Sequence, residues 1–379
     1  MTSANGQSLQ QSALPYMSTG NDKIIFADQL RGLAFLCVVI IHWLGIYSVN
    51  PQFISMVTGA PFELVGDKAY YKSISTFLPF FNYGPFGVSL FFLISGFVIP
   101  FSIKKKSRFR FIASRLVRIY PTYIACSLMM LVIYTLSHLY WGSDPTIDYN
   151  RFWSNITLTF SMFNYGSLDY INWTLSIEIK FYILCAILCT FIRSGNGVAI
   201  TATSLFITIF IFYTDHPASQ QNPGDFSMDG VRIELLYVIY MMLGVLFHFL
   251  YMKKIRTLTF VFLSLITMSL FYFSWVYAIQ HDRFPNEIFN YLYGFVVFAL
   301  AFNFRNKFRH NVLLQLLSNI SYPFYALHSV IGYCSIRYLE SIGVGYLQAI
   351  VVTFTFVMLL SYLVHISIET QSIKLSKRI

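Results

Sequence analysis

Long apolar segments are the feature that most constrains this chain. About 20 apolar residues, wound as a helix, cross the hydrocarbon core of a bilayer. The 379 residues contain ten such segments, at 24–45, 80–103, 111–137, 173–192, 198–213, 232–251, 257–278, 287–304, 312–337 and 344–366. Only 11% of the residues are charged, against about 25% in soluble domains. The sequence therefore predicts an all-α polytopic integral membrane protein with about ten transmembrane helices.

The distribution of Lys and Arg predicts the orientation of these helices. If the N-terminus is cytoplasmic, 18 of the 26 basic residues lie on the inner side and six on the outer side, while Arg31 and Lys180 lie within helices. This asymmetry follows the positive-inside rule, so we expect both termini in the cytoplasm. Residues 1–22 are then a disordered cytoplasmic tail, 23–370 the transmembrane domain and 371–379 a basic cytoplasmic tail. The net charge of +10 reflects topology, and no nucleic-acid partner is expected.

The cysteines and the small residues of the apolar segments are expected to be structural. The five cysteines lie inside apolar segments, and an odd number so placed argues against a disulfide framework. No short His or Cys spacing supports a metal site, so no metal is expected. Ser89 and Gly96, seven residues apart in the second segment, form a small-residue face suited to close helix packing.

The first apolar segment carries ionisable residues at Asp28, Arg31 and His42. Eleven residues make three helical turns plus about 20°, so Arg31 and His42 share a face, roughly 16 Å apart along the axis. Asp28 lies three residues before Arg31 and can pair with it. A histidine inside the membrane can act as a general base. A core histidine bonded to a neighbouring helix is the open alternative.

A basic inner stretch, KKKSRFRFIASRLVRIYPTY at 104–123, contains a second polar feature. Arg115 and Arg118 lie three apart on one helix face, where two guanidiniums can form one anion site. Their donor geometry suits phosphate, and Tyr120 follows the pair. A topology signal or a site for anionic lipid remains the alternative, and it accounts well for Lys104 to Lys106.

Two further apolar segments contain polar motifs. In NWTLSIEIKFY, Glu178 and Lys180 are two residues apart and do not face each other, so each needs a partner elsewhere. Glu178 is expected to hold the His42 imidazole or to line an acceptor pocket, and a structural ion pair stays open. In SNISYPFYALHSV, Tyr325 and His328 are expected to line a pocket.

The long outer loops, 46–79 and 138–172, are rich in Tyr, Trp, Asn and Gly. Such residues suit a sugar ligand, which stacks on aromatic rings and bonds to amides. Aromatic belts also occur at any membrane interface, so both interpretations stay open.

Taken together, these motifs resemble those of acyltransferase family 3, in its stand-alone form without an SGNH domain. The resemblance rests on five motifs in order, namely LRGLAFLCVVIIH, FFLISGF, SRLVRIYP, WTLSIEIKFY and SYPFYALH. Two positions depart from the family pattern: Gln29 stands where an acidic residue is frequent, and Ile179 replaces a second acidic residue after Glu178.

The resemblance implies a membrane O-acyltransferase of the bacterial inner (plasma) membrane. It would move an acetyl group from cytoplasmic acetyl-CoA to a hydroxyl of a cell-surface polysaccharide, such as O-antigen, or of its lipid-linked precursor. Direct transfer and transfer through an acyl-enzyme are both open. The roles expected are catalytic for His42, Glu178 and Asp28, donor-binding for Arg31, Arg115, Arg118 and Tyr120, and acceptor-pocket for Trp173, Tyr182, His328 and Tyr325.

Three other functions compete with this one. A transporter or flippase for a lipid-linked sugar or polar metabolite suits ten spans with buried charges, but it predicts an internal repeat, and residues 198–366 do not echo 24–190. An acyltransferase acting on a cytoplasmic or lipidic acceptor is the second. A receptor-like protein without chemistry leaves the histidines and the arginine pair unexplained.

The expected partners are membrane lipid and a glycan or glycolipid acceptor.

Overall fold

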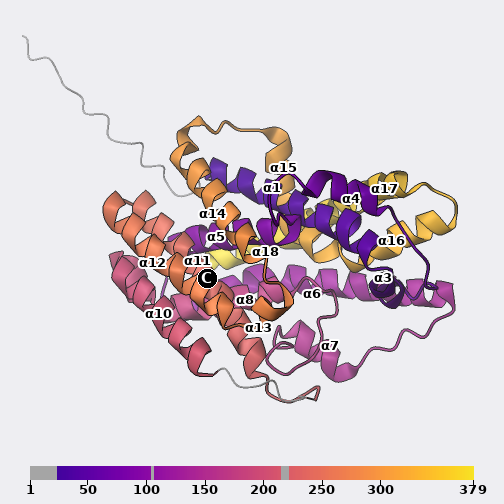
Figure 1. Cartoon of the computed structure of the whole chain (residues 1–379), viewed down its shortest axis with the longest axis horizontal. Helices are drawn as coiled ribbons and strands as arrows, with labels where there is room; N and C mark the ends of the chain where they lie inside the picture. The colour runs from indigo at the N-terminus through magenta and orange to yellow at the C-terminus, as the bar shows by residue number, and fades with distance from the viewer. Residues whose placement is uncertain (1–23, 104–105, 215–221) are drawn as a thin grey trace, which may run out of the picture.

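The computed structural model describes residues 24–103, 106–214 and 222–379, and winds most of them into helices (Figure 1). No strand occurs within these ranges. The predicted N-terminal tail, Lys104 and Lys105 lie outside the described residues.

Each of the ten predicted segments coincides with helical chain. The longest continuous helices are α1 (Ile25–Ile40) with the π-helix η1 (Ile41–Ile46) and α2 (Tyr47–Val49), α5 (Tyr83–Ile103), α6 (Arg108–Trp141), α11 (Met228–Tyr251), α12 (Thr257–Val276), and α17 (Tyr346–Val364) with the π-helix η3 (His365–Glu369) and α18 (Thr370–Arg378). The other apolar segments form α8 (Trp173–Ile187), α9 (Cys189–Ser194), α10 (Gly197–Tyr213), α14 (Ile288–Asn303), α15 (Val312–Leu327) and α16 (Val330–Ser341). The connections contain α3 (Pro51–Thr58), α4 (Lys68–Ser75), α7 (Tyr149–Ile156), α13 (Ile279–Arg283) and the 3-10 turn η2 (Arg305–Lys307).

Within the described ranges, six continuous helices are long and apolar enough to cross a membrane, and α10, α14 and α15 are shorter apolar helices. The polytopic, all-helical character predicted from the sequence is therefore confirmed. The number of crossings and the side on which the termini lie stay predictions.

Three predicted segments differ in detail. The segment 173–192 is interrupted at Leu188, and the segment 312–337 is interrupted at His328 and Ser329. The last segment continues as helix to Arg378, so the predicted basic tail is mostly the end of α18. This helix packs against α6.

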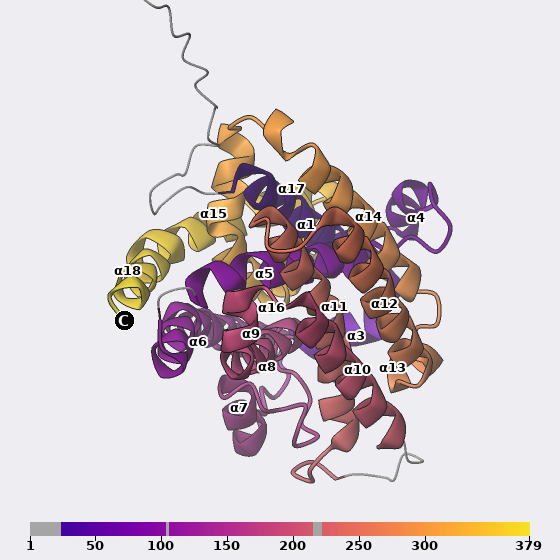
Figure 2. The same cartoon turned by 90° about the vertical axis from the view of Figure 1, so that its left-hand side faces the viewer.

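Helices α5 and α11 form the centre of the bundle and pack closely along their length. Figure 2 shows α6, α8 and α18 on one side of this centre and α10, α12 and α14 on the other. A Cβ added to Gly96 would lie 2.1 Å from the Met241 carbonyl oxygen, so only glycine allows this backbone contact. The small-residue face predicted in the second segment is confirmed, because Ser89 also meets a glycine, Gly294 of α14.

Basic residues assigned to the inner side gather at one end of the bundle. The Arg193 guanidinium donates to the carbonyl of Lys106 at 2.5 Å, and the Lys254 ammonium donates to the carbonyl of Ile192 at 3.2 Å. The Lys106 ammonium donates to the carbonyl of Ser376 at 2.9 Å. Three inner connections and the C-terminal helix therefore meet at one end, as the predicted alternation of loops requires.

The Gly96 contact gives a test of this packing. We expect Gly96→Ala to destabilise the protein by about 1–3 kcal/mol or more, because the methyl group would force the two helix backbones apart. Gly345→Ala is the control, since its Cβ would meet only the flexible end of Gln348 at 3.3 Å. Thermal unfolding in detergent measures both, and equal melting temperatures for the two variants would contradict the close packing of α5 on α11.

Candidate active site

The interruption between α15 and α16 creates the most distinctive part of the site. In a continuous helix the carbonyl of Tyr325 would accept from the amide of Ser329. Among the described residues it accepts instead from Nδ1 of the His328 ring, at 2.8 Å. The side chain thus satisfies a backbone group that the interruption frees, as is usual for broken helices at membrane depth.

The first helix is attached to this interruption through Trp43. The Trp43 indole nitrogen donates to the carbonyl of His328 at 2.9 Å. The indole fits there because Gly332 has no side chain: a Cβ at that position would lie 2.3 Å from the same nitrogen. His42, the neighbour of Trp43, is thereby brought to the same place.

The two predicted intramembrane histidines form a pair. The His42 and His328 rings lie edge to face with centroids 4.8 Å apart. His328 is fully buried and His42 is partly exposed. Nδ1 of His42 shares a hydrogen bond of 2.6 Å with the hydroxyl of Tyr333, and Nε2 of His328 is buried with no hydrogen-bond partner in the described chain. The helix is π-helical over Ile41–Ile46, a distortion that is frequent at functional sites.

A group of arginines lies at the other end of the same helix. Arg31 pairs with Asp28 at 3.4 Å, as the spacing predicted. Arg118, Glu178 and Glu369 are all close enough to interact electrostatically with Arg31.

Arg115 is the most enclosed member of the arginine group. Its side chain is buried, and the guanidinium lies 5.8 Å from the ring centroids of both Phe111 and Tyr182. Its Nε has no hydrogen-bond partner among the described residues, although buried donors are normally paired. Arg118, one turn further along α6, is exposed. The two predicted anion-binding residues therefore offer one unpaired buried donor and one accessible cation.

Glu178 belongs to the arginine group and not to the histidines. Its carboxylate accepts from the hydroxyls of Ser95 at 3.2 Å and Tyr182 at 2.7 Å. The expectation that Glu178 holds the His42 imidazole is wrong, because the recorded partner of His42 is Tyr333. Tyr182, expected in an acceptor pocket, lies with Glu178 and Arg115 at the same end.

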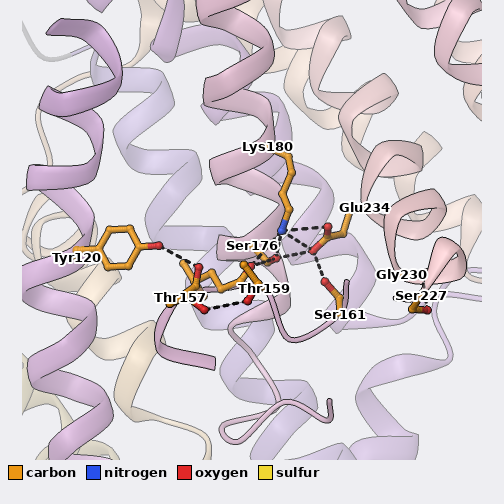
Figure 3. Close-up of polar contacts among 10 residues, drawn as sticks. Tyr120, Thr157, Thr159, Ser161, Ser176, Lys180, Ser227, Gly230 and Glu234 are labelled. Atoms are coloured by element: carbon orange, nitrogen blue, oxygen red, sulfur yellow. Dashed lines mark hydrogen bonds and ion pairs between the residues drawn. The ribbon is translucent and has the colours of Figure 1, made fainter. Parts of the chain in front are cut away.

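Lys180 has a separate partner, as its distance of two residues from Glu178 predicted. Figure 3 shows its ammonium between Glu234, Ser176 and the segment that follows α7. It lies 3.1 Å from Glu234, 2.6 Å from Ser176 Oγ and 3.1 Å from the carbonyl of Leu158. Ser161 and Ser176 also donate to the Glu234 carboxylate.

These contacts hold the segment 157–162 against the bundle, with Leu158 and Phe160 buried. The hydroxyl of Tyr120 donates to the carbonyl of Thr157 at 3.2 Å (Figure 3). Tyr120 therefore supports this segment, and no recorded bond joins it to the arginines among the described residues. Part of the predicted outer loop is thus a structural element packed against the bundle.

The remaining predicted residues, Tyr325 of α15 and Trp173 of α8, have different surroundings. Tyr325 donates to the carbonyl of Ile171 at 3.1 Å, and its ring centroid is 5.6 Å from that of His328. Trp173 packs against Phe92 and Tyr237, with ring centroids 6.3 and 5.4 Å away.

Three residues of these groups were not among the predicted ones. Glu234 is an ionisable residue inside an apolar segment, and that signal would have found it. Tyr333 has no such signal among 27 tyrosines. Glu369, which bonds to His365 at 2.7 Å, lies beyond the predicted end of the last segment.

Comparison with known proteins gives one finding. A family model described as an acyltransferase domain, that of acyltransferase family 3, matches residues 24–366. No curated protein and no solved structure matches the chain.

The Lys180–Glu234 pair should be essential to stability. We expect Lys180→Met to destabilise the protein by about 3–5 kcal/mol, because it leaves a carboxylate buried without its cation. In Lys180→Met with Glu234→Gln, the charge is gone and the amide oxygen still accepts from both serines, so stability should partly return. Thermal unfolding in detergent compares the two, and a double variant no more stable than the single one would contradict the ion pair.

The fit of Trp43 against Gly332 gives a second test. Gly332→Ala should lower stability by about 1–3 kcal/mol, because the new methyl group overlaps the indole. Trp43→Phe removes the overlapping atoms, so Gly332→Ala should cost less in that background. A double-mutant cycle on melting temperatures measures this coupling, and strictly additive losses would show that the two residues do not pack as described.

Proposed function

The chain belongs to acyltransferase family 3, and on this premise we propose that it is a membrane O-acyltransferase using acetyl-CoA. The acetyl group passes from the cytoplasmic donor to a hydroxyl of a cell-surface polysaccharide or its lipid-linked precursor, at the inner (plasma) membrane of a bacterium. The observation that carries the proposal is the presence of two polar groups along the first continuous helix (α1 with η1), one rich in arginine around Arg31 and one built around the paired histidines His42 and His328. They suit the two ends of an acyl-CoA, phosphate and thioester.

The arginine group is suited to the phosphates of the donor. Guanidinium and phosphate form charge-assisted, often bidentate hydrogen bonds. Arg115 supplies a buried Nε–H without a partner, and exposed Arg118 supplies a second cation. Arg31 is already paired with Asp28, so it is less free than Arg118 to bind a phosphate. Because Arg31 and His42 lie on the same continuous helix, Arg31 is proposed to lie beside the path of the pantetheine arm towards His42.

The histidine pair is suited to the transfer itself. Attack of a hydroxyl on a thioester requires a proton acceptor, and stabilisation of the developing oxyanion by a hydrogen-bond donor speeds it. The two rings, 4.8 Å apart, provide nitrogen atoms for both purposes at one place. The proton-accepting step is the one predicted for His42 from the sequence.

The acceptor is proposed to approach near the start of α8, where Tyr325 of α15 bonds to Ile171 and Thr174 and where Trp173 begins the helix. Tyr325 neighbours His328, and aromatic rings with amides and hydroxyls are the groups on which sugars stack and bond. The alternative, a transporter for a lipid-linked sugar, needs neither a thioester path nor a histidine pair.

Donor binding is the first test. We expect Arg115→Ala to weaken acetyl-CoA binding by about ten- to a hundred-fold, the loss of one hydrogen-bonded charge contact. Arg110→Ala is the matched control, since Arg110 is an exposed arginine in the same helix. Isothermal titration of the purified protein in detergent measures both.

Two results would count against the proposal. If wild type binds none of a panel of acyl-CoA molecules, the transporter takes first place. If Arg110→Ala weakens binding as much as Arg115→Ala, the basic end acts through general charge, and the specific donor site is lost.

A further inference from the structure

The proton positions on the two histidines follow from their partners. A carbonyl oxygen only accepts, so the bond to the Tyr325 carbonyl requires a proton on Nδ1 of His328. In the neutral ring the lone pair is then on Nε2. This atom is buried and unpartnered in the described chain. His328 therefore has a fixed ring with a free lone pair.

His42 has the opposite arrangement. The Tyr333 side chain is fully buried, and its only recorded hydroxyl partner among the described residues is Nδ1 of His42 at 2.6 Å. If the phenol donates, its proton and the Nδ1 lone pair are both satisfied. If Nδ1 donates, the phenol proton is left buried without an acceptor, which costs about 1–3 kcal/mol. The first arrangement is favoured, and it places the proton of neutral His42 on Nε2.

We infer that His328 is the general base of the transfer and that His42 is a hydrogen-bond donor to the reacting carbonyl oxygen. The inference rests on the proposed acyl transfer. It reverses the role that sequence reasoning gave to His42, and it adds His328 to the catalytic residues. Tyr333 is a positioning residue that holds the donor form of His42.

The step balances without any further reactant. Nε2 of His328 takes the proton of the acceptor hydroxyl while the hydroxyl oxygen bonds to the thioester carbonyl carbon. The carbonyl electron pair moves onto oxygen, which accepts a hydrogen bond from the Nε2–H of His42. When the carbonyl reforms, the C–S bond breaks and the CoA thiolate takes the proton from His328. The products are the ester and free CoA, with both histidines restored.

Exposure agrees with this division of roles. His42 is partly exposed and His328 is fully buried, so an incoming acyl group meets His42 first. The hydroxyl then fills the unsatisfied position at Nε2 of His328. When both rings are neutral, His328 already has the lone pair and His42 already has the N–H that the step requires. No proton exchange with water is needed before the transfer.

Amide substitutions separate the two roles. In His328→Asn the amide N–H occupies the place of Nδ1–H and keeps a donor for Tyr325, but nothing replaces Nε2. In His42→Gln the amide N–H occupies the place of Nε2–H, whereas His42→Ala has no donor. His281→Gln, at an exposed histidine, is the control.

The experiment follows acetyl-CoA binding and release of free CoA by purified protein in detergent, with water as acceptor. We expect His328→Asn to bind acetyl-CoA and to lower the cleavage rate by about 10²–10⁴-fold. His42→Ala should lower the rate by about 10²–10³-fold, the effect of losing one oxyanion donor, and His42→Gln should recover at least about ten-fold of that loss. His281→Gln should match wild type.

Other outcomes overturn the inference. If His42→Gln is no faster than His42→Ala, His42 is not the donor. If His328→Asn stays within about ten-fold of wild type, below the usual range for a general base, His328 is not the base. If the wild-type protein neither binds nor cleaves acetyl-CoA, the proposed function is contradicted, and the inference fails with it.

Discussion

The hydrogen bond from the Trp43 indole to the carbonyl of His328 joins the two elements on which the site depends. One element is a helix that becomes π-helical at Ile41, and the other is interrupted after Leu327. An interruption at membrane depth exposes backbone groups that must find partners inside the protein. Here the His328 imidazole supplies a partner for the freed Tyr325 carbonyl, while the Trp43 indole adds a second bond to the His328 carbonyl, which also accepts from the Gly332 amide. The His328 ring is thus oriented by a bond that makes the interruption tolerable, and the indole holds the first helix against it.

Ionisable side chains in the helices must also find partners inside the protein, and they differ in how completely they do so. Lys180 and Glu234 satisfy each other with two serines and a carbonyl, so their role is structural: they hold the segment 157–162 against the bundle. Arg115 is buried without a partner for its Nε. Since a buried donor is normally paired, this contrast is what the proposal of an anion site at Arg115 rests on.

Local spacing predicted a substantial part of this arrangement. The pairing of Asp28 with Arg31, the small-residue face around Gly96 and the separate partners of Glu178 and Lys180 all follow from helical periodicity along one segment. The meeting of His42 with His328 is different in kind, because it joins positions 286 residues apart in the sequence. Both histidines belong to motifs of the family, but those motifs do not predict that the two rings are in contact.

What the sequence did not predict depends on contacts between helices. No proline or glycine stands next to Ser329 to mark the interruption in the sequence. The interruption is accompanied by the packing of Trp43 against Gly332, a contact between helices that helical periodicity does not predict. The family resemblance implied a place for Tyr182 in the acceptor pocket, but its helix face turns it towards Glu178 and Arg115. A position along the chain sets the depth of a side chain, whereas the neighbouring helix sets its partner.

The charge balance of the arginine group bears on how a donor is held. Three guanidiniums, those of Arg31, Arg115 and Arg118, lie near the carboxylates of Asp28, Glu178 and Glu369, and Lys106 also interacts with Arg115. Much of the positive charge is thus balanced, and a polyanion must depend on individual hydrogen bonds as well as on general attraction. Asp28 already occupies Arg31, and Glu178 is satisfied by two hydroxyls. The cations left to act are Arg115 and Arg118, so under the proposed function recognition of a phosphate would rest on the geometry of this pair.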